Sequence, residues 1–160
     1  MSMVEIHNSV AKIYEENKET LEIFECLDEF SDTQNFCDHY GFDIEDSCNA
    51  ILIKAKKPEE FYAMFCVLGA NRLDVNHKAK EAMGAKRVSF ASREEAEAVT
   101  GQIYGGISPL GLPENIKVYM DKNVTDREKL FIGAGNRVSK FFLSPETLID
   151  LSSAKVLDLT

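Results

Sequence analysis

Apolar segments of strand length recur along this chain, and short helical patterns separate them without regular alternation. The spacing of Ile6, Val10 and Ile13 predicts an amphipathic helix over residues 3–18, with its acidic side facing solvent. Because regular βαβ units are missing from the pattern, it favours an α+β fold with a mixed, curved, barrel-like β-sheet flanked by short helices. The predicted strands cover residues 21–27, 48–54, 61–69, 87–91, 116–121, 129–133, 138–143 and 154–159.

Capping residues mark where the intervening helices begin. Ser31 with Gln34, and Ser92 with Glu95, have the spacing of a capping box, in which each side chain accepts a hydrogen bond from the other residue's backbone. Glycines close three of the patterns, as expected for helix ends. The expected helices cover residues 31–41, 74–84 with Asp74 or Asn76 as cap, 92–101, and 144–151 with Ser144 before Pro145.

The bulk composition is that of one globular domain covering residues 1–160, with 44% apolar residues to build its core. No window approaches 18 consecutive apolar residues, and the start MSMVEIHNSV lacks a basic, apolar leader, so we expect a cytoplasmic protein without a membrane span. Four cysteines without a CxxC pair indicate reduced core residues. Three scattered histidines lack ligand spacing, so we expect no metal and no other cofactor.

The net charge of −9 is concentrated at one end of the chain. Residues 1–50 contain two basic and 13 acidic residues, a net charge of −11, whereas residues 51–160 contain 16 basic and 14 acidic residues. A local basic surface for nucleic acid is therefore compatible with the later part of the chain, although solvated strand ends are the simpler interpretation. The candidate phosphate contacts are Lys54, Lys56, Lys57 and Arg72.

The segment YGGISPLGLP, residues 104–113, gathers three glycines and two prolines in ten positions. Such a loop can direct successive N–H groups at an anion or at a developing oxyanion. No GK[ST] follows the glycines, and GISPL lacks a glycine that the GxSxG elbow requires, so neither motif applies. Ser108 also has no histidine nearby in sequence to activate it. On composition alone, an inert turn is the alternative interpretation.

A resemblance to a known family is carried by five segments in order: NAILIK, FYAMFCVLGANRLDVNHKAKEAMGAKRVSFAS, TGQIYGGISPLGLP, VYMD and IGAGNRVSKFFLSPETL. Together they resemble the YbaK-like aminoacyl-tRNA deacylases, a family related to the editing domain inserted in bacterial prolyl-tRNA synthetases. The resemblance runs from about residue 20 to the C-terminus. Its most specific part contains the family's GxxxP signature as Gly105 to Pro109.

The resemblance implies a trans-acting domain that hydrolyses the ester of mischarged tRNA without a metal. The glycine loop would then cradle the substrate, with Pro109 fixing its path. Expected partners are mischarged tRNA, bound weakly because the net charge repels polyanions, and an aminoacyl-tRNA synthetase; the oligomeric state stays open. The candidate catalytic residues are Asn49, Gly105, Pro109 and Lys140, and the candidate substrate-binding residues are Gly106, Ile107, Ser108 and Arg137.

The chain departs from the family pattern at one site position. Family members have a lysine before the first buried strand, as in KTLLV, where this chain has Asn49. Asparagine brings no positive charge, so Lys140, which shares a strand face with Phe142, could supply the missing amine from another strand. In the alternative interpretation, Lys140 extends its ammonium into solvent and Asn49 bonds only to backbone.

Three functions therefore stay open at this point. The chain could be a deacylase, or a non-catalytic module of the same fold that binds a tRNA 3′ end or a small ligand after losing the lysine. A protein-interaction domain that uses the acidic N-terminal region is the third alternative. The sequence does not name the amino acid, because side chains from several strands set the volume of a pocket.

Overall fold

The structure is a computed structural model that describes residues 4–160. Residues 1–3, and with them the predicted helix start at residue 3, lie outside the described residues. None of the helices within residues 4–160 has the length and apolar character needed to span a bilayer. The helices are α1 (Asn8–Glu16), α2 (Thr33–Tyr40), α3 (Lys80–Met83), α4 (Arg93–Thr100) and α5 (Pro145–Ser152). The strands are β1 (Glu22–Glu25), β2 (Cys48–Lys57), β3 (Phe61–Leu68), β4 (Arg87–Phe90), β5 (Lys117–Asp121), β6 (Leu130–Gly133), β7 (Ser139–Leu143) and β8 (Lys155–Leu157).

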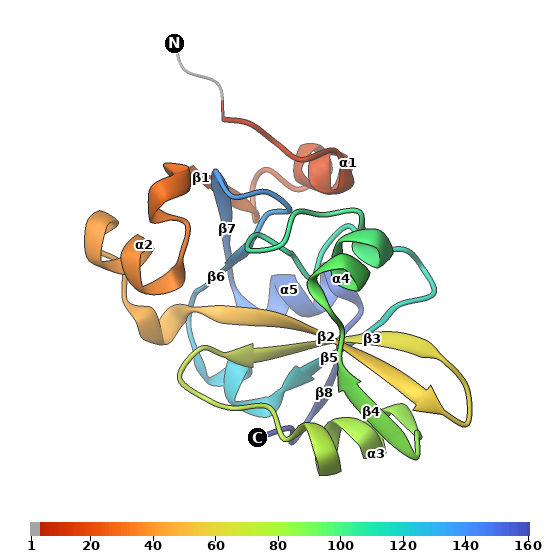
Figure 1. The fold of residues 1–160 in the computed structure, drawn as a ribbon. Coiled ribbons are helices and arrows are strands. Elements are labelled where there is room, and N and C mark those ends of the chain that lie inside the picture. The colour runs from red at the N-terminus through yellow and green to blue at the C-terminus, as the bar shows by residue number, and fades with distance from the viewer. Residues whose placement is uncertain (1–3) are drawn as a thin grey trace.

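The strands form two sheets. The smaller sheet has the order β1-β7-β6 and is antiparallel, whereas the larger has the order β4-β2-β3-β5-β8 and is mixed, with β5 parallel to β3 and to β8. A parallel bridge between Ser47 and Phe131 joins the sheets where β2 begins. The α+β fold with a mixed sheet is therefore confirmed, although the strands of residues 4–160 do not close into a barrel. In Figure 1 the larger sheet lies above α3, and β7 extends toward α1 and α2.

Alternating strand residues build apolar clusters on both faces of the larger sheet. Leu52 points into the main core between the two sheets, and its neighbour Ile53 points to the opposite face, where α3 packs. A third cluster is aromatic and joins α2 to the smaller sheet through Phe36, Phe131 and Phe142. Because both faces are covered, β2 and β3 show apolar runs with little alternation.

The capping predictions are confirmed at α4 and wrong in part at α2. Ser92 and Glu95 form the predicted reciprocal capping box. At α2 the cap is Asp32, whose carboxylate accepts a hydrogen bond from the Gln34 N–H at 3.1 Å. Ser31 instead ends a 3-10 turn, η1 (Asp28–Phe30), which gives it helical backbone angles and turns its side chain into the protein. An N-cap residue needs an extended backbone, so Ser31 is excluded.

The helix α1 is shorter than predicted, and its apolar side packs against the protein, while Glu15 and Glu16 on its acidic side are exposed, as predicted. It begins after His7, whose imidazole accepts a hydrogen bond from the Ser9 N–H, and Val10 is fully buried. A side chain at Gly111 would overlap the Ser9 carbonyl, so the helix start and the glycine-rich loop touch through their backbones. The N-terminal segment therefore supports the loop from outside.

All four cysteines are free and buried, as predicted for reduced core residues. Cys26 and Cys37 belong to the aromatic cluster of α2, and Cys48 and Cys66 belong to the main core.

Candidate functional site

A cavity of about 450 Å³ opens between four segments that are far apart in sequence. Its walls are the start of β2, the loop residues 104–107, the facing ends of β6 and β7, and the N-terminal end of α2. Six of the residues predicted as catalytic or substrate-binding line this cavity: Asn49, Gly105, Gly106, Ile107, Arg137 and Lys140.

Contacts between two backbones hold the glycine loop against the turn that joins β6 to β7. The Ile103 N–H donates to the Gly135 carbonyl at 2.9 Å, and the Gly135 N–H donates to the Gly106 carbonyl at 2.7 Å. A side chain at Gly106 would overlap the carbonyl of Asn136, and one at Gly133 would meet the backbone of the loop. Glycine is required at both positions because nothing larger fits between the two backbones.

A buried glutamine that does not line the cavity fixes the path of the loop. The Gln102 amide accepts a hydrogen bond from the Ser108 N–H and donates one to the Leu110 carbonyl at 2.9 Å. The Ser108 hydroxyl accepts from the Leu110 N–H at 3.1 Å and is fully buried. Ser108 and Pro109 are both buried and do not line the cavity.

Two N–H groups of the loop remain available to a ligand. The backbone amides of Tyr104, Gly106 and Ser108 donate hydrogen bonds within the protein. Those of Gly105 and Ile107 have no hydrogen-bond partner within residues 4–160, and both residues line the cavity. Free backbone donors on a cavity wall are suited to a carbonyl oxygen that becomes negatively charged.

Lys140 is buried in the cavity wall, with 7% of its surface exposed. Its ammonium donates to the Ser31 carbonyl at 3.1 Å and lies 5.0 Å from the centre of the Phe36 ring. It forms no ion pair with a carboxylate of the described chain, and burial lowers the pKa of the Lys140 ammonium. The interpretation in which Lys140 extends into solvent is wrong, because β7 lies between two strands and faces α2.

Arg137 adds a second positive charge at the same cavity. Its Nε donates to a carboxylate oxygen of Asp28 at 2.6 Å, which fixes the guanidinium on one side. The other side lies beside Gly105, where an added Cβ would overlap Nη1. The φ of +94° at Gly105 and this close approach both favour glycine there.

Asn49 stands at the start of β2, opposite Val67 of β3, and is exposed. Its side chain forms no hydrogen bond with any residue in the range 4–160, so its amide can donate to and accept from a ligand. The cavity therefore has a neutral amide where the family pattern has a lysine, and the ammonium of Lys140 comes from a different strand.

Sequence reasoning missed the wall formed by α2 and the aromatic residue at the cavity opening. Ser31, Asp32 and Thr33 line the cavity because η1 ends directly before α2. Tyr104, 48% exposed, lies at the opening, with the Arg93 guanidinium 5.5 Å from its ring centre. Only Tyr104 had a sequence signal, as the neighbour of the two glycines.

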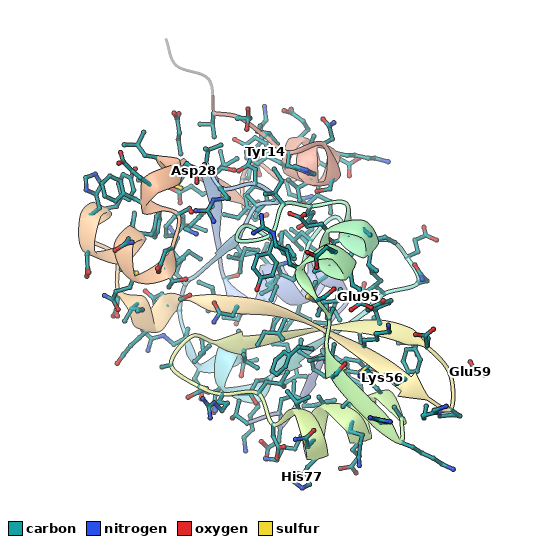
Figure 2. The ribbon with its side chains drawn as sticks, in the orientation of Figure 1. Tyr14, Asp28, Lys56, Glu59, His77 and Glu95 are labelled. Atoms are coloured by element: carbon teal, nitrogen blue, oxygen red, sulfur yellow. The ribbon has the colours of Figure 1, made fainter. Side chains whose placement is uncertain are left out.

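The four predicted phosphate contacts do not line this cavity. The Lys54 ammonium pairs with Glu95 at 2.7 Å and with Glu60 at 3.1 Å, and these hydrogen bonds raise its pKa. Lys56, Lys57 and Arg72 are exposed. In Figure 2, Lys56 lies at the far end of the β2–β3 hairpin from Asp28, the partner of Arg137.

The site consists mainly of hydrogen-bond donors and positive charge. No group of three or more His, Cys, Asp and Glu side chains within residues 4–160 is placed to hold a metal ion. The free N–H groups, the Asn49 amide and the two cations can instead bind and polarise an ester or a phosphate oxygen.

Several known proteins are similar to this chain in sequence or in fold. The aminoacyl-tRNA editing domain model matches residues 28–151. Over 92 residues the chain is 30% identical to an Enterococcus faecalis protein provisionally named Cys-tRNA(Pro)/Cys-tRNA(Cys) deacylase EbsC, covering 58% of this chain and 56% of that protein. Over 106 residues it is 33% identical to a proline--tRNA ligase of Nautilia profundicola, covering 65% of this chain and 18% of the ligase.

The fold also superposes on a crystal structure provisionally described as a trans-editing enzyme for prolyl tRNA synthetase. The TM-score is 0.82 at 22% identity, over 98% of this chain and 99% of the other. The chain spans about half the length of the Enterococcus relative and less than a fifth of the ligase. Because the family match covers every segment that lines the cavity, the predicted resemblance is confirmed: the chain belongs to the aminoacyl-tRNA editing domain family.

Proposed function

We propose that this protein is a trans-acting aminoacyl-tRNA deacylase that hydrolyses the ester of mischarged tRNA. One observation carries the proposal: a single cavity combines two free loop N–H groups with the charges of Lys140 and Arg137. Ester hydrolysis requires donors for the oxyanion and a fixed position for water, and this cavity offers groups for both.

In the proposed reaction, water attacks the ester carbonyl carbon, and the carbonyl oxygen takes up negative charge. The N–H groups of Gly105 and Ile107 donate to that oxygen, and the Asn49 amide orients the water. The bond from the carbonyl carbon to the ribose oxygen then breaks. The ribose oxygen takes one proton of the attacking water, the second proton passes to solvent, and the amino acid leaves as a carboxylate.

Lys140 takes over the positive charge that related sequences place at position 49. The ammonium enters the same cavity from β7 and is held by the Ser31 carbonyl. A charge-assisted hydrogen bond is stronger than a neutral one, so Lys140 contributes more than Asn49 to binding the substrate.

The rest of the tRNA is proposed to meet the protein outside the cavity. Tyr104 at the opening offers its ring to a terminal base. Lys56, Lys57 and Arg72 are the proposed phosphate contacts, whereas the two carboxylates at Lys54 reduce its contribution. A synthetase partner is proposed because a similar domain occurs within a proline--tRNA ligase.

The test is incubation of the purified protein with a panel of mischarged tRNAs, with release of each amino acid measured against a buffer control. Hydrolysis above the control supports the proposal. Binding of tRNA without hydrolysis of any ester would instead favour a binding module that lost its activity. In that case Asn49→Lys is expected to restore turnover.

A further inference from the structure

The cavity wall formed by η1 and α2 carries polar groups without protein partners. The Ser31 hydroxyl is the buried side-chain group of residues 4–160 that lacks a hydrogen-bond partner, and the residue is 3% exposed. A buried hydroxyl without a partner is costly, and native proteins retain few of them. Ser31 lines the cavity, so a group that enters the cavity can supply the missing acceptor.

The Lys140 ammonium, which contacts the Ser31 carbonyl, also has fewer hydrogen-bond acceptors than it has donor hydrogens. An ammonium carries three donor hydrogens, and the Ser31 carbonyl accepts one of them at 3.1 Å. The surroundings are the Phe36 ring and the apolar cluster that contains Cys26 and Cys37, with no carboxylate in an ion pair. A buried ammonium in such apolar surroundings is strongly stabilised when a further oxygen accepts a hydrogen bond from it.

Asp32 provides the opposite charge at the opening of the same wall. It follows Ser31 in the chain, lines the cavity and is exposed. One carboxylate oxygen accepts from the Gln34 N–H, and the other forms no hydrogen bond within the described chain. The wall thus presents an anionic group near solvent and two donors deeper inside.

An aminoacyl ester has matching chemistry, because its α-ammonium and its side chain branch from one carbon. We propose that Asp32 pairs with the α-ammonium, and that the Ser31 hydroxyl and the Lys140 ammonium donate to an oxygen of the side chain. The substrates are then esters of amino acids with an oxygen-bearing side chain. This inference rests on the proposed function and names its substrate class. An apolar side chain would leave both donors unsatisfied.

The test compares threonyl and valyl esters, which have nearly the same shape, on one tRNA transcript charged by an aminoacylating ribozyme. The wild-type protein is expected to hydrolyse the threonyl ester at least about tenfold faster. Ser31→Ala is expected to lower this ratio severalfold, because only the Lys140 ammonium then donates to the side-chain oxygen. The matched control is Ser47→Ala, because Ser47 is a second buried serine of the cavity whose hydroxyl lies beside Gly69; it should keep the ratio. Equal rates, or faster hydrolysis of the valyl ester, would overturn the inference.

A binding measurement separates this inference from the proposed function. Hydrolysis of other esters of the panel, but of neither the threonyl nor the valyl ester, contradicts the inference and leaves the proposed function standing. If the wild-type protein hydrolyses no ester of the whole panel of mischarged tRNAs, the proposed function fails. Calorimetry with non-hydrolysable threonyl and valyl 3′-amides of a CCA oligonucleotide then decides the inference. Binding of the threonyl amide about tenfold more tightly, with a smaller preference in Ser31→Ala, supports it. Equal binding, or no binding of either amide, contradicts it.

Discussion

Lys140 and Lys54 are two lysines with low exposure in different sheets of the molecule, and their surroundings differ. Lys54 of β2 has two carboxylate partners, Glu95 and Glu60, so its charge is balanced within the protein. Lys140 of β7 has a backbone carbonyl and aromatic neighbours, and its charge is not balanced. A balanced ion pair connects strands to a helix, whereas an unbalanced charge in a cavity is typical of a binding site.

The largest expected effect comes from removing the unbalanced charge. Lys140→Met should lower the rate of ester hydrolysis about 10–100-fold, because the substrate loses a charge-assisted hydrogen bond. The melting temperature at pH 7 should be unchanged or higher, since a buried unpaired charge is replaced by an apolar side chain of similar volume. Kinetics and thermal melting of the same preparation check both parts. A clear loss of stability together with full activity would show that Lys140 has a structural role like that of Lys54, and would contradict the contrast between the two lysines.

The pH dependence of this stability difference follows from the direction of the pKa shift. The pKa of Lys140 in the folded protein is below its ordinary value of 10.5. Between the pKa of Lys140 in the folded protein and its pKa in the unfolded chain, the unfolded chain binds more protons than the folded protein. The stability of the wild-type protein therefore rises with pH over this range. Any advantage of Lys140→Met should therefore shrink as the pH approaches 10.5.

A second prediction compares two glycines with similar backbone strain. Gly105 has φ +94° beside Arg137, and Gly101 has φ +71° with open space around it. Alanine at either position should cost about 1–2 kcal/mol of unfolding free energy. Only Gly105→Ala should also lower hydrolysis, because its Cβ displaces the Arg137 guanidinium. Equal activity of the two variants would show that the loop acts as a plain turn.

The third prediction concerns the balanced lysine. Lys54→Met leaves Glu95 and Glu60 without their partner, so the melting temperature at neutral pH should fall by a few degrees. Its effect on hydrolysis should be much smaller than that of Lys140→Met, because Lys54 does not line the cavity. Thermal melting and hydrolysis kinetics of Lys54→Met and Lys140→Met at low salt make this comparison. If both variants lost the same activity, the two lysines would not differ in function.

Glu95 offers a pH test of the same ion pair. Hydrogen bonds from Lys54, the Ser92 backbone and Tyr62 lower the pKa of the Glu95 carboxyl from 4.5 to about 2. A lowered carboxyl pKa stabilises the fold above the unfolded value, and this contribution disappears as the pH falls toward the folded value. Glu95→Gln should therefore melt below the wild-type protein at pH 7, and the gap should close between pH 4.5 and about 2. A gap independent of pH would contradict this assignment.

The smallest expected effect is on tRNA affinity. Replacing Lys56 or Lys57 by alanine should weaken tRNA binding modestly, and each proposed phosphate contact removed should reduce the slope of log K against log salt by about one. A salt titration of binding measures this slope. An unchanged slope in both variants would place the tRNA on another surface.

Local sequence patterns predicted most of the fold. Apolar segments of strand length located all eight strands found in residues 4–160, and the reciprocal pair Ser92 and Glu95 located α4. These patterns work because helix and strand periods, and the need to satisfy backbone groups at helix ends, act over a few residues. The same short range explains the error at Ser31, since a preceding 3-10 turn changed its backbone angles.

The sequence by itself determined that residues 104–113 form a loop rich in glycine and proline, and that position 49 lacks the lysine of the family pattern. Only the tertiary structure decided that Lys140 shares a cavity with that loop and with Ser31. The orientation of Lys140 depends on β7 lying between β1 and β6, with α2 against one face. Burial and charge balance are set by segments that meet across about a hundred residues of chain, as Lys140 and Ser31 do, and no local pattern encodes such a meeting.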